Sequence, residues 1–276
     1  MKQPVIGFIG GGNMATSLIG GLIQSGYEPQ NIWVSDHNLD KRKRQKEQFQ
    51  VQTSASNIEV LKCAEILVLA IKPQHAYTVV QELKDPFKTY HPLIVSIVTG
   101  VKTTHLERWF GTHTAIVRVM PNTPVLLRTG ASGLYANLEV TEEQKSLAES
   151  LLRAVGITVW VNHEKDLDAI TALSGSGPAY FFLIMEAIQS SGEALGLSPA
   201  IAKLLTLQTA LGAARMGLES DLNLEELRQR VTSIGGTTEQ ALRVLESGGL
   251  RDLLNKAIQA AKERAIEISA QFDKET

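Results

Sequence analysis

The sequence predicts an α/β protein: an N-terminal Rossmann-type, doubly wound parallel sheet followed by an all-α C-terminal domain. Over the first 161 residues, strand-like apolar runs alternate with helical patterns, which is typical of parallel βα units. From residue 162 onwards no further strand-like run appears, and helical periodicity continues to the end. We therefore expect two domains, at residues 1–161 and 162–276.

Composition excludes several classes of protein. The 276 residues suffice for two domains, and 43% hydrophobic and 20% charged residues are typical of a soluble globular chain. The formal net charge of -2 gives no field that favours nucleic acid or an anionic membrane. We expect no signal peptide and no apolar run near the roughly 20 residues that span a bilayer.

The cysteine and histidine residues argue against disulfides and metal sites. The single cysteine, Cys63, excludes an internal disulfide and favours a reducing compartment, so we expect a cytoplasmic location. Its apolar helical context favours a buried small residue rather than a nucleophile. The six histidines have no metal-ligand spacing, so no metal is expected.

The first element is the apolar run Val5–Ile9, which leads into a glycine turn and a helical pattern. Gly10, Gly12 and Ala15 fit the Gly-x-Gly-x-x-Gly/Ala pattern of a dinucleotide-binding turn. The glycines permit a sharp turn and close approach of a pyrophosphate, while the helix start supplies free N–H groups. The alternative is a glycine-rich turn without a ligand.

The second strand, Ile32–Ser35, precedes residues that bear on the choice between NAD and NADP. Asp36 occupies the position at which an acidic residue meets the adenosine ribose, which favours NAD. The cationic segment Lys41–Lys46, with Ser35 and His37 nearby, offers donors for a 2′-phosphate. A solvated helix face explains the cations equally well. We favour NADP(H), and the sequence leaves NAD(H) open.

Three more apolar runs follow, at residues 66–71, 93–98 and 115–119. Each ends in residues suited to a ligand, because open α/β sheets bind ligands beyond the carboxyl ends of their strands. Lys72 is placed to reach the cofactor, although a surface lysine is nearly as good an interpretation. Thr99 begins a small turn, and Asn122 lies in a rigid turn between two prolines. A helix near 141–155 and a strand at 157–161 close the domain.

Helices account for the second half. One helix from Glu164 is expected to break at Ser174–Pro178, because proline removes a donor and the glycines relax the backbone. Further helices are expected at residues 179–195, 199–218, 224–231, 240–246 and 250–272. Because this helical domain is rich in apolar residues and has few polar faces, we expect part of its surface to be buried against a second subunit.

A second glycine-rich turn, Ser233–Thr238, enters a helix without a preceding strand. Its N–H groups and hydroxyls suit a small anion such as a substrate carboxylate, but a capped helix start with a flexible linker is an equal alternative. The second half has no obvious catalytic histidine, whereas hydroxyls are plentiful. This favours a substrate that is already electrophilic, such as a protonated imine, which the protein need only position.

Five motifs together resemble those of the pyrroline-5-carboxylate reductases, in the same order and over essentially the whole chain. They are residues 6–15, 70–74, 118–124, 174–180 and 231–238. The resemblance implies an N-terminal Rossmann domain and a C-terminal domain that dimerises by interleaving helices, with further assembly into decamers in many members. It implies the NAD(P)H-dependent reduction of L-1-pyrroline-5-carboxylate to L-proline, the last step of proline biosynthesis.

The resemblance also assigns residues to the two ligands. The cofactor-binding residues are Gly10, Gly12, Asn13 and Met14 near the pyrophosphate, Ser35, Asp36, His37 and Asn57 near the adenosine ribose, and Ala70, Ile71, Lys72, Pro73, Ile97, Val98, Thr99 and Asn122 in the remainder. The substrate-binding residues are Ser233, Gly235, Gly236, Thr237 and Thr238. Thr238 is the expected catalytic residue and bonds the ring nitrogen. Ile234 and Thr99 depart from the family, which usually has proline and alanine there.

Two other functions are weighed against this one. A β-hydroxyacid dehydrogenase-like reductase would use an interdomain lysine as general acid/base, and Lys165 is the nearest candidate, although it precedes the 174–178 break. A non-enzymatic, nucleotide-sensing Rossmann protein would not need the second glycine turn. Reduction of pyrroline-5-carboxylate by either nicotinamide cofactor separates these alternatives.

Overall fold

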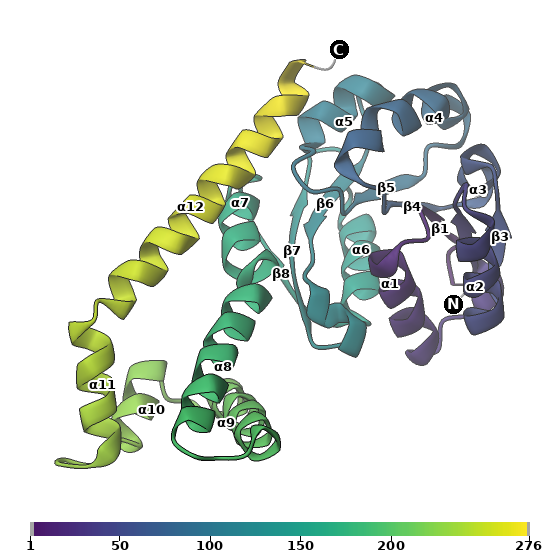
Figure 1. Ribbon diagram of the computed structural model, residues 1–276. Helices are drawn as coiled ribbons and strands as arrows, with labels where there is room; N and C mark the ends of the chain where they lie inside the picture. Colours follow the sequence, from purple (N-terminus) through teal and green to yellow (C-terminus); the bar gives the residue numbers. More distant parts are fainter. Residues whose placement is uncertain (1–2, 275–276) are drawn as a thin grey trace. The chain divides into compact units, whose positions relative to one another are not determined.

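The N-terminal part of the chain forms an eight-stranded sheet, which a computed structural model describes within residues 3–274 (Figure 1). The strand order is β3-β2-β1-β4-β5-β6-β7-β8. The strands are β1 Ile6–Ile9, β2 Ile32–Ser35, β3 Gln52–Ser54, β4 Ile66–Leu69, β5 Leu93–Ser96, β6 Ile116–Met120, β7 Gly130–Ala136 and β8 Gly156–Trp160. The first six strands are parallel, and the order reverses between β1 and β4. The predicted doubly wound parallel sheet is confirmed.

Helices cover both faces of this sheet (Figure 1). They are α1 Asn13–Gln24, α2 Leu39–Phe49, α3 Asn57–Cys63, α4 Ala76–Tyr90, α5 Thr103–Phe110, α6 Glu142–Arg153 and α7 Asp166–Ile170. Ile6 and Phe8 pack into a core with α1 and α6, whereas Ile9 packs into a second core with α3, α4 and α5. Alternate β1 side chains thus enter opposite cores, as expected for a strand buried on both faces.

Strand β7 is antiparallel to β6 and parallel to β8, and the sequence analysis did not predict it. Its sequence, GASGLYA, lacks the β-branched run that marks the other strands. A Cβ on Gly133 would lie 2.5 Å from Cδ1 of Ile170, so helix α7 packs directly on this strand. The glycine content reflects this close approach of two elements, which a local pattern does not reveal.

The chain forms two compact units that differ from the expected boundary at 161/162. The first unit contains the described residues up to Ser176 and again from Ala261, and the second contains Gly177–Ala260. Residues 162–176 join the first unit because Glu164 and Asp168 pair with Arg118 of β6. The last helix, α12 (Leu250–Gln271), begins in the second unit and ends in the first.

The expected break at 174–178 is a π-helical turn, Thr171–Gly175, in which the Ser176 N–H donates to the Thr171 carbonyl at 2.9 Å. Helix α8 (Gly177–Ala194) continues directly from it. The sequence pattern predicts no apolar run near membrane-spanning length. Because the turn joins α7 to α8, however, the stretch Asp166–Ala194 reaches 29 residues and could cross a bilayer by length and composition alone, a test that core helices of soluble proteins also pass.

The second unit is helical throughout and has few buried side chains. Besides α8 it contains α9 Pro199–Glu219, α10 Leu224–Arg230, α11 Thr237–Ser247 and the start of α12. Its largest exposed apolar side chains include Phe181, Phe182, Leu183, Leu204, Leu205 and Leu211. Such an extended apolar surface is typical of a region that a protein partner covers.

Candidate functional site

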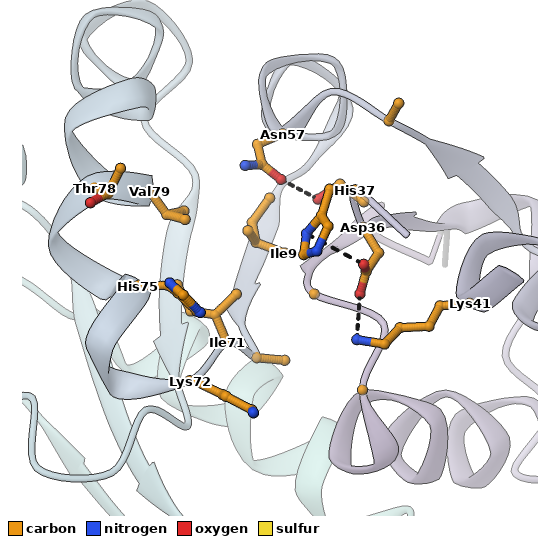
Figure 2. A pocket seen from close by; sticks show the side chains of 15 residues that line it. Ile9, Asp36, His37, Lys41, Asn57, Ile71, Lys72, His75, Thr78 and Val79 are labelled. Atoms are coloured by element: carbon orange, nitrogen blue, oxygen red, sulfur yellow. Dashed lines mark hydrogen bonds and ion pairs between the residues drawn. The ribbon is translucent and has the colours of Figure 1, made fainter. Parts of the chain in front are cut away.

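A cavity of about 540 Å³ lies beyond the carboxyl ends of β1, β2, β3 and β4, where the strand order reverses. This is the position at which open α/β sheets bind their ligands. The lining residues are Ile9, Gly10, Gly12, Ser35, Asp36, His37, Lys41, Ala55, Asn57, Ala70, Ile71, Lys72, His75, Thr78 and Val79. Figure 2 shows their side chains converging from the ends of these strands and from α4.

The glycine turn after β1 is shaped by close contact with the residue that follows β4. Gly10 has a φ of 99°, and a Cβ there would lie 2.4 Å from the Ala70 carbonyl oxygen, so a larger residue is excluded. By contrast, a Cβ on Gly12 would meet no atom within 4 Å. No side chain caps α1 at Gly12, and the first N–H groups of a helix have no acceptor within it. These N–H groups and the open space beside Gly12 fit a pyrophosphate.

Asp36 is bound mainly by the protein itself. Its Oδ2 accepts the Gly11 N–H at 3.0 Å and the Lys41 ammonium at 3.2 Å, and its Oδ1 accepts the Asn38 N–H at 2.9 Å. Burial alone would raise the pKa of the Asp36 carboxyl, but these donors outweigh it and hold the pKa below its usual range. The side chain that the sequence assigned to a ribose therefore also fastens the glycine turn to β2.

Cationic and polar groups form the rim around Asp36 (Figure 2). The His37 ring is almost fully exposed and lies 3.7 Å from Oδ1 of Asp36, while Lys41 reaches Oδ2 from α2. On the other side, Ser35 donates to Oδ1 of Asn57 at 2.7 Å, and the Asn57 amide donates to Glu82 at 2.9 Å. The rim thus offers hydroxyl and amide groups for a ribose and cations for a phosphate.

The remaining expected cofactor residues divide into two groups. Ala70, Ile71 and Lys72 line the cavity, whereas, among described residues, Asn13, Met14, Pro73, Ile97, Val98, Thr99 and Asn122 do not. Pro73 begins the turn Pro73–His75 that leads into α4. That turn and α4 bring His75, Thr78 and Val79 to the cavity, and the sequence analysis missed all three. The only available signal was their place just after a strand end.

One expected cofactor residue, Asn122, makes its contacts elsewhere in the first unit, and the expected burial of Cys63 is wrong. The Asn122 amide donates to the Ser174 carbonyl at 3.1 Å and its oxygen accepts the Ala131 N–H at 2.9 Å, so it links β7 to the π-helical turn. Cys63 was expected to be buried, but it is exposed at the last position of α3.

The second glycine turn precedes α11 in the second unit. The Gly236 N–H donates to the Ser233 carbonyl at 3.0 Å, and Gly235 has a φ of 72°. The Gly235 N–H donates to the Glu239 carboxylate at 2.8 Å. Helix α11 has no side-chain cap at Gly236, which leaves the N–H groups of Thr237 and Thr238 at the helix start for an anion.

Comparisons with known proteins address both units. The sequence model of the family described as pyrroline-5-carboxylate reductase dimerisation matches residues 164–268. The model described as NADP oxidoreductase, coenzyme F420-dependent, matches residues 5–100. A pyrroline-5-carboxylate reductase from Pseudomonas aeruginosa is 48% identical over 272 residues, covering 99% of both chains. The chain belongs to the pyrroline-5-carboxylate reductase family.

Solved structures agree with this membership. A pyrroline-5-carboxylate reductase from Coxiella burnetii is 51% identical, with a TM-score of 0.93 over 97% of this chain and 99% of that one. A pyrroline carboxylate reductase from Plasmodium falciparum with NADP bound is 30% identical, with a TM-score of 0.86 over 98% and 99%. Family membership confirms the Rossmann domain and the helical domain that the sequence predicted.

Proposed function

We propose that this protein is an NAD(P)H-dependent oxidoreductase that reduces L-1-pyrroline-5-carboxylate to L-proline, the final step of proline biosynthesis. The observation that carries the proposal is the 48% identity with a reductase of this name over 99% of both chains. The cavity at the reversal point of the sheet and the free N–H groups of α1 support it independently. Lys165, the lysine of the dehydrogenase alternative, is exposed just before α7.

The preferred cofactor is NADP(H). Three protein donors already occupy Asp36, so its carboxylate has little remaining capacity to accept ribose hydroxyls. The Lys41 ammonium beside it offsets the carboxylate charge that would otherwise repel a 2′-phosphate. His37 adds a second donor at the same rim. NADH remains a usable cofactor, because the pyrophosphate contacts are common to both.

We assign the cofactor contacts as the sequence suggested. Gly10, Gly12, Asn13 and Met14 surround the pyrophosphate at the start of α1. The ribose contacts come from Ser35, Asp36, His37 and Asn57, and the remaining contacts from Ala70, Ile71, Lys72, Pro73, Ile97, Val98, Thr99 and Asn122. When bound, the cofactor supplies the hydride that reduces the C=N carbon.

The second glycine turn binds the substrate. Ser233, Gly235, Gly236 and Thr237 form the turn that receives the substrate carboxylate, and the N–H groups of Thr237 and Thr238 bind it at the positive end of α11. Glu239 holds the turn in shape through the Gly235 N–H. The Thr238 hydroxyl hydrogen-bonds the ring nitrogen and orients the imine. As hydride reaches the C=N carbon, the electron pair of the C=N π bond moves to the nitrogen, which takes a proton from Thr238 or water, or keeps the proton it already carries.

One assay tests the reaction. Purified protein is mixed with L-1-pyrroline-5-carboxylate and either NADPH or NADH, and the loss of reduced nicotinamide absorbance is followed while L-proline is quantified by chromatography. We expect turnover with both cofactors and a higher kcat/KM with NADPH. Cofactor binding without turnover would contradict the proposed enzymatic activity and favour a nucleotide-sensing protein.

The second unit associates with a second copy of the chain. Helices α8 and α9 have exposed apolar side chains, including Phe181, Phe182 and Leu205. Both helices lie within residues 164–268, which match the family model described as pyrroline-5-carboxylate reductase dimerisation. We assign the exposed apolar side chains of α8 to this interface rather than to a membrane, and the protein to the cytoplasm, without a nucleic-acid partner. Light scattering should give at least twice the 30.1 kDa of one chain, and ten times for a decamer.

A further inference from the structure

The turn that follows β5 is covered by the C-terminal end of α12, and both belong to the first unit (Figure 1). The Ser269 hydroxyl of α12 donates to the Gly100 carbonyl of the turn at 2.8 Å. The Ser269 side chain is fully buried, with an exposed fraction of 0%. A buried hydroxyl that satisfies a buried carbonyl fixes the position of that carbonyl, because losing the bond leaves the acceptor without a partner.

The backbone of the turn is shaped to the end of this helix. Gly100 has a φ of 81°, and a Cβ at this position would lie 2.7 Å from Cγ2 of Ile268. The Gly100 backbone therefore packs closely against Ile268, the residue next to Ser269. On the β5 side, the Ser96 hydroxyl oxygen accepts the Val98 N–H at 3.4 Å, so the turn is held from two directions.

Independent contacts fasten the end of α12 to α5. Phe272 is buried with its ring 6.1 Å from that of His105 and 6.3 Å from that of Trp109. Arg108 donates to the Phe272 carbonyl at 2.9 Å, and the His105 ring lies 2.7 Å from Asp273. Loss of the Ser269 hydroxyl alone would consequently leave the helix in place and free only the turn.

The imidazole of His105 makes both contacts in its neutral form. Its Nδ1 accepts the Lys102 N–H at 3.2 Å, so the ring proton is on Nε2, which donates to Oδ1 of Asp273. Helix α5 follows the turn and α12 covers it. The His105 ring thus joins the two helices while it carries no net charge.

We propose that Ser269 is a positioning residue for hydride transfer: it acts through the Gly100 carbonyl and holds the Ile97–Thr99 wall of the nicotinamide site. This inference rests on the proposed function, which assigns that turn to the nicotinamide end. A small shift of such a wall changes the distance over which hydride moves, and reaction rates depend steeply on this distance. The residue itself touches neither cofactor nor substrate.

The test is Ser269→Ala, with Ser150→Ala as the matched control. Ser150 is also a helical serine, but its hydroxyl donates to the Leu147 carbonyl of its own helix, α6. For Ser269→Ala we expect kcat to fall about tenfold, with the KM for NADPH changed less than threefold, since loose positioning affects the chemical step more than binding. The primary isotope effect with 4-deuterated NADPH should increase. Ser269→Thr, which keeps the hydroxyl, should restore most of the rate.

An unchanged kcat and isotope effect in Ser269→Ala would overturn the inference. Should this variant unfold, Ser269→Cys replaces it, because a thiol of similar size donates only weakly; full activity of that variant would count equally against the proposal. Hydrogen exchange of the Val101 amide, which bonds the Val98 carbonyl across the turn, gives a readout that needs no turnover. If the Val101 amide exchanges faster in Ser269→Ala than in the wild type, Ser269 holds the turn as proposed. If the wild type nevertheless shows no turnover, the proposed reaction is wrong.

Discussion

The two glycine turns of this protein both lead into a helix without a side-chain cap, yet their surroundings differ. Around Gly10 the shape is fixed by tertiary contacts, since a Cβ there would collide with the carbonyl oxygen of Ala70, the residue after β4. Around Gly235, which also has a positive φ, a Cβ would meet no atom within 4 Å, and the adjacent Ile234 is 98% exposed. Among the described residues, the hydrogen bonds of this second turn join residues 233–240 to one another.

This difference indicates which parts of the protein support each of the two turns, the one proposed for the cofactor and the one proposed for the substrate. The first turn is supported by two buried cores within a single chain, so one chain contains the cofactor cavity. The second turn belongs to a unit whose apolar helix faces are exposed, which is why we propose that a second copy covers them. Substitutions at the first turn should affect folding and cofactor binding, whereas those at the second should affect turnover.

The largest effect is expected for Gly10→Ala. The substitution combines a strained left-handed backbone, about 1–2 kcal/mol, with overpacking against Ala70, about 1–3 kcal/mol. We expect the free energy of unfolding to fall by roughly 2–5 kcal/mol, measured by denaturant titration of the protein without cofactor.

Gly12→Ala is the matched control, because its φ of -76° suits any residue and its Cβ would meet no protein atom. Its stability should change by less than about 0.5 kcal/mol. The added methyl group would nevertheless occupy the space assigned to the pyrophosphate, so NADPH affinity should fall at least tenfold. Normal NADPH binding by Gly12→Ala would mean that the pyrophosphate lies elsewhere.

At the second turn, Thr238→Ala should lower kcat by roughly 10- to 100-fold, since it removes the proposed donor to the ring nitrogen. The dissociation constant for NADPH, measured by fluorescence titration, should stay within about twofold. Thr238→Ser retains the hydroxyl and serves as the control. A fully active Thr238→Ala variant would show that another group orients the imine.

Lys41→Ala sharpens the assignment of the cofactor rim. Removing the ammonium beside Asp36 should raise the KM for NADPH about tenfold, which corresponds to about 1.4 kcal/mol, while the KM for NADH changes little. Lys46→Ala lies in the last turn of the same helix and should affect neither. Equal losses with both cofactors would argue that Lys41 stabilises the turn instead of recognising the 2′-phosphate.

Gly235→Ala tests the contrast directly, because it introduces the backbone strain of Gly10→Ala without a collision. We expect a loss of only about 1 kcal/mol in the free energy of unfolding, measured by the same denaturant titration. A loss as large as that of Gly10→Ala would mean that the second turn is as tightly packed as the first.

The smallest effect concerns pH and the C-terminal end of α12. Burial lowers the pKa of His105, and Asp273 opposes this only in part. Since the folded protein then binds the proton more weakly than the unfolded chain, stability should decrease as pH falls below about 6.5, the ordinary histidine pKa. Asp273, whose pKa is also lowered, keeps its charge in this range.

This pH effect is measured as the change in Tm between pH 8 and pH 5.5. For the wild type we expect a lower Tm at pH 5.5 than at pH 8, with part of the difference due to this group. His105→Gln, which retains a donor for Asp273, should lose that part of the slope. An identical slope in the two proteins would show that other groups control the pH dependence.

The sequence by itself determined much of the fold and nine of the fifteen residues that line the cavity. The spacing of Gly10, Gly12 and Ala15 after an apolar run predicted the turn at the end of β1, and the apolar runs predicted most of the parallel strands. Such features are local, because strand and helix periodicity and glycine conformation act over a few residues. The serine and threonine motif at 233–238 was recognisable for the same reason.

Only the tertiary structure decided which groups are free and which are already occupied. It showed that Asp36 is held by Gly11, that Asn122 links β7 to the π-helical turn, and that the end of α12 returns to α5. Each of these contacts joins residues whose side chains are ordinary in their local sequence. Packing and hydrogen bonding between segments far apart in the chain depend on the complete fold, and for this reason no local pattern could reveal them.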